Sequence, residues 1–168
     1  MKRIIVLLFL ILAVMLQLAV FSRFQLQSGK IDLILLIVIA WSLQPEISRI
    51  DILLVSLFSG FLIGFISIEP FWLVVSVYLL ATFFSIYLKY RFAQIPILSM
   101  FLSGVIFTFI HLILSMFVYQ ISGALIDFQT GFEKVVLPSL LLSIIASIPV
   151  YLVVSEIRRM TFPGMEEL

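Results

Sequence analysis

Long apolar runs separated by short polar breaks make up most of the 168-residue chain. A helix that crosses a hydrocarbon core roughly 30 Å thick needs about 20 predominantly apolar residues. Five segments meet this requirement, and a sixth, 31–43, is short for a full crossing, so a re-entrant or thinned span is its competing interpretation. The predicted spans are 4–22, 31–43, 50–68, 71–88, 95–119 and 135–155.

The composition indicates the same class of protein. Hydrophobic residues make up 64% of the chain and charged residues 11%, whereas soluble domains are roughly 45–50% apolar and about 25% charged. The basic start and apolar run at the N-terminus are typical of a signal peptide, but no A-x-A-like cleavage site follows, so we interpret the run as a retained helix. We therefore expect an all-α integral membrane protein, a compact six-helix transmembrane bundle forming a single domain over 1–168.

The distribution of basic residues predicts the orientation of this bundle. With six spans, seven basic residues fall on one side of the membrane and three on the other. The positive-inside rule then puts both termini in the cytoplasm. The basic residues occur in ones and twos along the chain, which gives no nucleic-acid-binding surface. The seven are Lys2, Arg3, Arg49, Lys89, Arg91, Arg158 and Arg159, and the three are Arg23, Lys30 and Lys134.

The stretch SGFLIGFIS, residues 59–67, places two glycines four residues apart in an apolar helix. Glycine costs a helix interior about 1 kcal/mol relative to alanine, but small residues let membrane helices approach closely. On a helical wheel one face collects small side chains, which predicts either packing within the chain or docking of a separate transmembrane helix. These small residues are Ser56, Ser59, Gly60, Gly64 and Ser67.

Candidate chemistry is sparse. His111 is the chain's one histidine and lies near the middle of a predicted span, where an ionisable group is a functional hypothesis by default. With no acid nearby on its own helix, we expect a neutral imidazole hydrogen-bonded to Ser or Thr of an adjacent helix. Asp32 lies at a helix start, where the dipole favours a carboxylate, so we expect it to cap that helix. The chain lacks cysteine and the motifs of intramembrane proteases and nucleotide-binding proteins, so we expect no enzymatic activity, cofactor or metal.

Four segments in order carry a resemblance to a known family. They are LLFLILAVMLQLAVF with its Gln17, KIDLILLIVIAWSL, GFLIGFISIEPFW, and VLPSLLLSIIASIPVYLVV followed by two arginines. In this order the chain resembles MreD, the small multi-pass rod shape-determining protein of bacteria. The family commonly starts its second span with Pro-Asp-Leu-Leu-Leu; here Ile31 replaces the proline and Asp32 keeps the acid. The family often has an aspartate after the paired glycines; here Ile68 falls near that place and Glu69 follows.

The resemblance implies a non-enzymatic scaffold in the bacterial cytoplasmic (inner) membrane, part of the cell-elongation (rod) complex that supports lateral peptidoglycan synthesis and cell shape. It implies binding to a bitopic MreC-like partner and, through it, to the MreB filament and to the SEDS glycosyltransferase with its class B penicillin-binding protein. MreD-like proteins are also similar in fold to the S-components of ECF transporters. A small-ligand-binding transporter subunit is therefore the alternative, although the Ser- and Gly-rich inner faces favour helix contact over ligand recognition.

Overall fold

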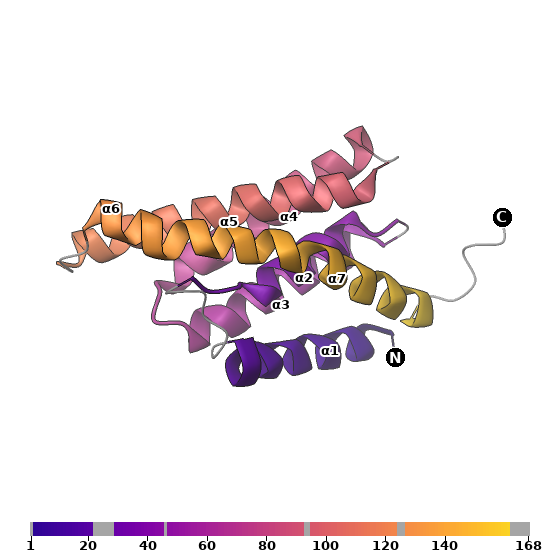
Figure 1. Cartoon of the computed structure of the whole chain (residues 1–168). Helices are drawn as coiled ribbons and strands as arrows, with labels where there is room; N and C mark the ends of the chain where they lie inside the picture. The colour runs from indigo at the N-terminus through magenta and orange to yellow at the C-terminus, as the bar shows by residue number, and fades with distance from the viewer. Residues whose placement is uncertain (1, 22–28, 46, 93–94, 124–126, 162–168) are drawn as a thin grey trace.

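The computed structural model describes residues 2–21, 29–45, 47–92, 95–123 and 127–161, and its elements are helices (Figure 1). The first helix continues into a π-helical segment, η1, and a second π-helical segment, η2, joins a short helix to the last long one. The elements are α1 (Lys2–Leu16), η1 (Gln17–Phe21), α2 (Leu33–Leu43), α3 (Arg49–Ile66), α4 (Phe71–Arg91), α5 (Pro96–Ile121), α6 (Phe128–Gly131), η2 (Phe132–Val136) and α7 (Leu137–Thr161).

Four helical stretches are long and apolar enough to cross a membrane: α3, α4, α5 and the run Phe128–Thr161, which joins α6, η2 and α7. Large apolar side chains are exposed along these helices, such as Phe65 with 80% and Ile145 with 70% of its surface exposed. Such a surface suits contact with lipid tails. The prediction of an all-α chain is confirmed for the described residues, and these four stretches are compatible with a membrane bundle. The helical run that contains the predicted span 135–155 begins earlier, at Phe128, because α6 and η2 precede α7 without a break.

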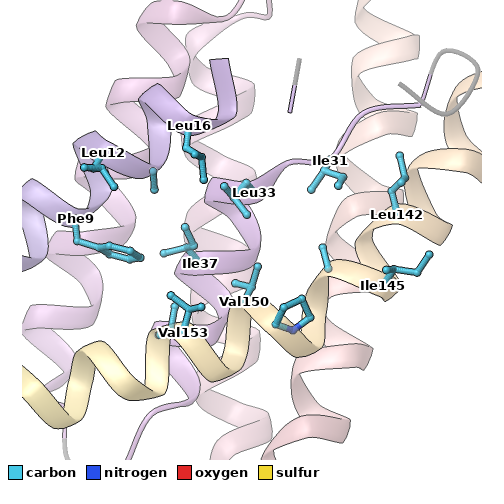
Figure 2. Close-up of a pocket in the computed structure, with 14 residues that line it drawn as sticks. Phe9, Leu12, Leu16, Ile31, Leu33, Ile37, Leu142, Ile145, Val150 and Val153 are labelled. Atoms are coloured by element: carbon cyan, nitrogen blue, oxygen red, sulfur yellow. The ribbon is translucent and has the colours of Figure 1, made fainter. Parts of the chain in front are cut away.

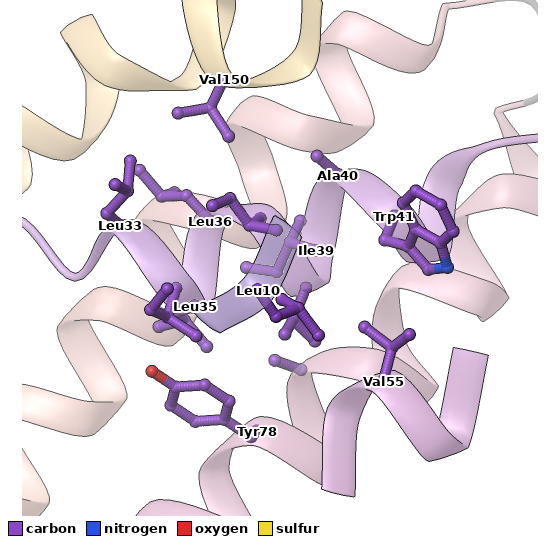
Figure 3. Close-up of a cluster of buried hydrophobic side chains, with 14 of the residues drawn as sticks. Leu10, Leu33, Leu35, Leu36, Ile39, Ala40, Trp41, Val55, Tyr78 and Val150 are labelled. Carbon is purple, nitrogen blue, oxygen red and sulfur yellow. The ribbon is translucent and has the colours of Figure 1, made fainter. Parts of the chain in front are cut away.

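The short helix α2 is the centre of the bundle. All eleven of its residues are buried, and α1, α3, α4, α5 and α7 contact it. Its sequence, LILLIVIAWSL, has no polar face, as expected for a helix surrounded on all sides. At 1.5 Å per residue α2 is only about 16 Å long, roughly half the thickness of a hydrocarbon core. Figure 3 shows its side chains packed against Tyr78 of α4, Val55 of α3 and Val150 of α7.

The two ends of α2 are fixed at different levels of α4. At its start, Asp32 accepts a hydrogen bond from the hydroxyl of Tyr78. At its end, the ammonium group of Lys89 donates to the backbone oxygen of Gln44. The two helices therefore run side by side in the same direction. In Figure 1 the start of α1 and the end of α7 lie at one end of the bundle, and α6 lies at the other.

Candidate functional site

Three ionisable side chains from distant parts of the sequence meet beside the start of α2. The ring of His111, in α5, lies between the carboxylate of Glu69, in the turn between α3 and α4, and the carboxylate of Asp32. Its Nε2 is 2.7 Å from Oε2 of Glu69, and its Nδ1 is 3.4 Å from Oδ2 of Asp32. The Tyr78 hydroxyl donates to Oδ1 of Asp32 over 2.8 Å. We call Asp32, Glu69, Tyr78 and His111 the polar cluster.

The expectation that His111 pairs with a Ser or Thr of an adjacent helix was wrong. Its partners are two acids that lie far away in the sequence, and only the folded bundle brings them to the ring. A neutral imidazole can donate a hydrogen bond from only one of its nitrogens. Because both nitrogens face carboxylate oxygens, the positively charged imidazolium is the form of His111 that satisfies both contacts.

Local structure holds each acid in place. Asp32 is the N-cap of α2, since its Oδ1 accepts a hydrogen bond from the backbone N–H of Leu35 at 3.0 Å, and the prediction of a capping role is confirmed. Ser67 is the C-cap of α3, and its hydroxyl accepts a hydrogen bond from the backbone N–H of Glu69 at 3.1 Å. Pro70 then precedes α4. The turn is therefore short and fixed, and it holds Glu69 beside α5.

Gln17, which directly follows α1, connects the first helix to the start of α2. Its side-chain oxygen accepts a hydrogen bond from the backbone N–H of Ile34 at 3.0 Å. The first turn of an α-helix leaves N–H groups without partners inside the helix. At the start of α2, Asp32 and Gln17 each satisfy one of these groups.

A cavity of about 400 Å³ adjoins the polar cluster; we call it the polar cavity. The side chains of Asp32 and Glu69 keep 16% and 19% of their surface exposed, and that of His111 keeps 11%, so the cluster is in reach of a molecule in the cavity. Among the described residues, no three His, Asp or Glu side chains are arranged to hold a metal ion. The polar lining residues are Gln17, Lys30, Asp32, Ser67, Glu69, Thr108, His111 and Tyr119.

A second cavity, of about 390 Å³, lies between α1, α2 and α7 and is lined only by apolar residues. Figure 2 shows that it follows α7, with Ile31 and Leu142 at one end and Phe9 and Val153 at the other. We call it the apolar groove. Ile31 lines both the groove and the polar cavity. Its lining residues are Phe9, Leu12, Ala13, Leu16, Ile31, Leu33, Ile37, Leu142, Ile145, Ala146, Pro149, Val150, Val153 and Val154.

The small-residue face of α3 packs against α4 of the same chain. A Cβ atom added to Gly60 would lie 3.2 Å from the Cα of Val75, and one added to Gly64 would lie 2.7 Å from Cδ2 of Phe71. Ser56 is fully buried, and its hydroxyl accepts a hydrogen bond from Thr82 at 2.8 Å. Of the two interpretations of this face, the structure shows packing within the chain.

The sequence analysis did not assign Glu69 or Tyr78 to a site. One signal for Glu69 was present, because it is the only charged residue between Asp51 and Lys89, and a lone acid in apolar surroundings needs a partner. Tyr78 gave no such signal, since tyrosine is common in membrane helices. Comparison of the chain with family models, with curated proteins and with solved structures found no match.

Proposed function

We propose that the protein is an MreD-like, non-enzymatic scaffold of the bacterial cell-elongation complex. In this proposal the chain crosses the cytoplasmic membrane six times with both termini in the cytoplasm. It binds an MreC-like bitopic protein and, through it, the MreB filament and the SEDS glycosyltransferase with its class B penicillin-binding protein. Its contribution is to hold these partners together during lateral peptidoglycan synthesis.

One observation supports the proposal beyond the sequence resemblance. Three polar residues from the segments that carry the resemblance, Gln17, Asp32 and Glu69, lie together at the start of α2. Gln17 and Asp32 bind its first N–H groups, and Glu69 and Asp32 hold His111 between them. These polar positions therefore connect η1, α2, the α3–α4 turn and α5 at one place in the bundle.

Co-purification tests the proposal. A tagged copy is expressed in a rod-shaped bacterium whose own MreD is depleted, and the membrane fraction is purified in mild detergent. The expected result is recovery of rod shape together with co-purification of the MreC-like protein. A protein that is abundant and folded in the membrane, yet neither restores rod shape nor retains an MreC-like partner, would contradict the proposal.

A second candidate function, a small-ligand-binding subunit of an ECF-type transporter, is favoured by the polar cavity. The inner faces are not restricted to Ser and Gly, since Asp32, Glu69 and His111 adjoin a space of about 400 Å³, and most ligand sites measure 300–1,000 Å³. A thermal-shift screen of purified protein against water-soluble vitamins separates the two functions. A stabilising vitamin would favour the transporter subunit, whereas no shift with any of them would favour the scaffold.

A further inference from the structure

A third cavity lies where the end of α4 meets the start of α5, at the same end of the bundle as the start of α1 (Figure 1). We call it the end cavity. Its volume is about 420 Å³, within the roughly 300–1,000 Å³ of most ligand sites. Four of its lining residues carry hydrogen-bond donors, and none of the lining residues that the structure describes is an acid. The four are Lys89, Tyr90, Ser99 and Tyr151.

The start of α5 adjoins this cavity, since Pro96, its first residue, is part of the lining. The first turn of a helix leaves N–H groups without partners inside the helix, and the helix dipole adds partial positive charge there. In the part of the chain that the structure describes, no side chain caps this 26-residue helix. An N-terminus of this kind favours an anion, but it does not identify a site without a second observation.

Ser99 supplies the second observation. It lies in the first turn of α5 and lines the end cavity. Only 2% of its surface is exposed, and its buried hydroxyl oxygen has no hydrogen-bond partner among the described residues. Most buried side-chain polar atoms in proteins do have a partner. A ligand atom held at the first turn of α5 would provide one, so the hydroxyl and the helix N-terminus point to the same position.

Positive charge lies on the α4 side of the same cavity. The ammonium group of Lys89 donates to the backbone oxygen of Gln44, which fixes this charge beside the end of α2. The guanidinium group of Arg49 lies over the ring of Tyr90, 5.5 Å from its centroid, and donates to the Tyr90 hydroxyl over 3.4 Å. Because the hydroxyl accepts this hydrogen bond, it can donate its own proton to an anion. Both charges therefore favour a negatively charged ligand.

The number and placement of the donors favour a phosphate group. Donors come from α4, α5 and α7, and a phosphate monoester presents three strong acceptor oxygens to them. Lysine is a common phosphate ligand in proteins. The rest of the wall is apolar and includes Pro45 and Phe92, which suits an organic group attached to the phosphate. In the six-span topology this end of the bundle is cytoplasmic, where lipid headgroups and soluble phosphate esters are both present.

We infer that the end cavity binds a phosphate monoester, with its phosphate at the first turn of α5 between Ser99 and Lys89. The ester is either the headgroup of an anionic lipid or a soluble molecule of the cytoplasm, and the two share the same contacts. This binding does not require a protein partner, so it can hold or fail independently of the proposed scaffold function.

Thermal unfolding of the detergent-purified protein with four probes tests this inference, because a ligand that binds only the folded state raises the melting temperature. Phosphatidic acid is compared with diacylglycerol of identical acyl chains, and glycerol 3-phosphate is compared with glycerol. The expected result is a saturable rise with phosphatidic acid, with glycerol 3-phosphate or with both, beyond that of the phosphate-free counterpart. A rise with phosphatidic acid alone assigns the site to a lipid headgroup, and one with glycerol 3-phosphate shows that a soluble ester suffices. No difference within either pair would overturn the inference.

Two matched serines locate the phosphate. Ser99 and Ser103 lie one turn apart on α5, and both have a buried hydroxyl without a partner among the described residues, but only Ser99 lines the cavity. Replacing either by alanine removes an unpaired polar group, so neither variant should lower the melting temperature without ligand. Ser99→Ala should weaken binding of the phosphate probe about fivefold or more, as expected for loss of a hydrogen bond to a charged group. Ser103→Ala should not. Equal affinity in the two variants would overturn the position of the phosphate.

Lys89→Gln tests the charge, and its control is Arg91→Gln, which removes an exposed charge from the same helix end outside the cavity. Lys89→Gln should weaken binding about tenfold, because it removes a charge-assisted contact, and Arg91→Gln should leave it unchanged. Since Lys89 also holds the end of α2, Tyr90→Phe replaces Lys89→Gln if the latter does not fold, and it should weaken binding about fivefold. Undiminished affinity in the folded variant would overturn the inference.

Discussion

Replacing Gly60 and Gly64 separately by leucine tests the contact between α3 and α4. The two glycines are one helical turn apart on the same helix, so each serves as the control for the other. Their neighbours differ. A Cβ added to Gly60 would lie 3.2 Å from the Cα of Val75 and 3.7 Å from the Cβ of Tyr78, whereas the three atoms nearest to a Cβ added to Gly64 all belong to the ring of Phe71.

The expected effects follow from how far each neighbour can move. At Gly60 the added side chain meets the backbone of α4, which can move only if the two helices separate, and overpacking of this kind costs about 1–3 kcal/mol. Separation of the helices also displaces Tyr78 from Asp32, which removes a hydrogen bond from the polar cluster. At Gly64 the ring of Phe71, with 36% of its surface exposed at the first residue of α4, can rotate toward the lipid. The ring then gives up its contacts with Phe61 and Phe65, which are worth about 0.5–1.5 kcal/mol each. The better helix propensity of leucine favours both variants equally.

We therefore expect Gly60→Leu to lower the free energy of unfolding by about 1 kcal/mol more than Gly64→Leu does, which is the contribution of the hydrogen bond between Tyr78 and Asp32. Reversible unfolding in mixed micelles with increasing SDS measures the difference, and the cellular level of each variant should follow the same order. If both variants unfold at the same SDS fraction, or if Gly64→Leu is the less stable, the account of the α3–α4 contact is refuted.

Three further results are expected. Cysteines introduced at Gln129 and Arg91, in this cysteine-free chain, should react with an impermeant maleimide from opposite sides of the membrane; labelling from one side would refute the six-span topology. His111→Gln should lower the unfolding free energy by about 2–3 kcal/mol, because it leaves partly buried carboxylates without a cation, and unchanged SDS unfolding would contradict this role. Hydrogen bonds from the hydroxyl and the backbone N–H of Thr130 hold the pKa of Asp127 below its ordinary 3.8. The cap of Asp127 on α6 therefore stabilises above pH 3.8 and is lost as the pH falls through the lowered pKa. An NMR titration should show that Thr130→Ala raises this pKa, and no change would refute the hydrogen bond from the Thr130 hydroxyl.

Much of the fold follows from the sequence because each long helix carries its own signal. The apolar runs predicted α3, α4 and α5 to within a few residues, and the acid at Asp32 predicted the start of α2. The burial of α2 inside the bundle was harder to predict. An apolar run of this length is compatible with a thinned span, a re-entrant segment or a buried core helix. Its complete burial depends on the five helices that surround it.

The polar cluster was predictable only in part. A helical wheel compares residues on one helix, so for His111 it identifies only neighbours on α5, which are Gly104, Thr108 and Ser115. Thr108 does contact another helix, with its hydroxyl 3.2 Å from that of Ser143 on α7. The acids that bind the histidine come from a cap and a turn, and no periodicity relates these to a position on α5. Only the tertiary arrangement supplies that relation.

Nitrogen-15 NMR of protein labelled only at histidine tests the polar cluster most directly, because His111 is the single histidine of the chain. The account predicts at neutral pH a ring that carries a proton on both nitrogens, since each nitrogen faces a carboxylate oxygen. Glu69→Gln should shift chiefly the Nε2 resonance, and Asp32→Asn should shift chiefly the Nδ1 resonance. A neutral ring whose two resonances stay unchanged in both variants would contradict the account.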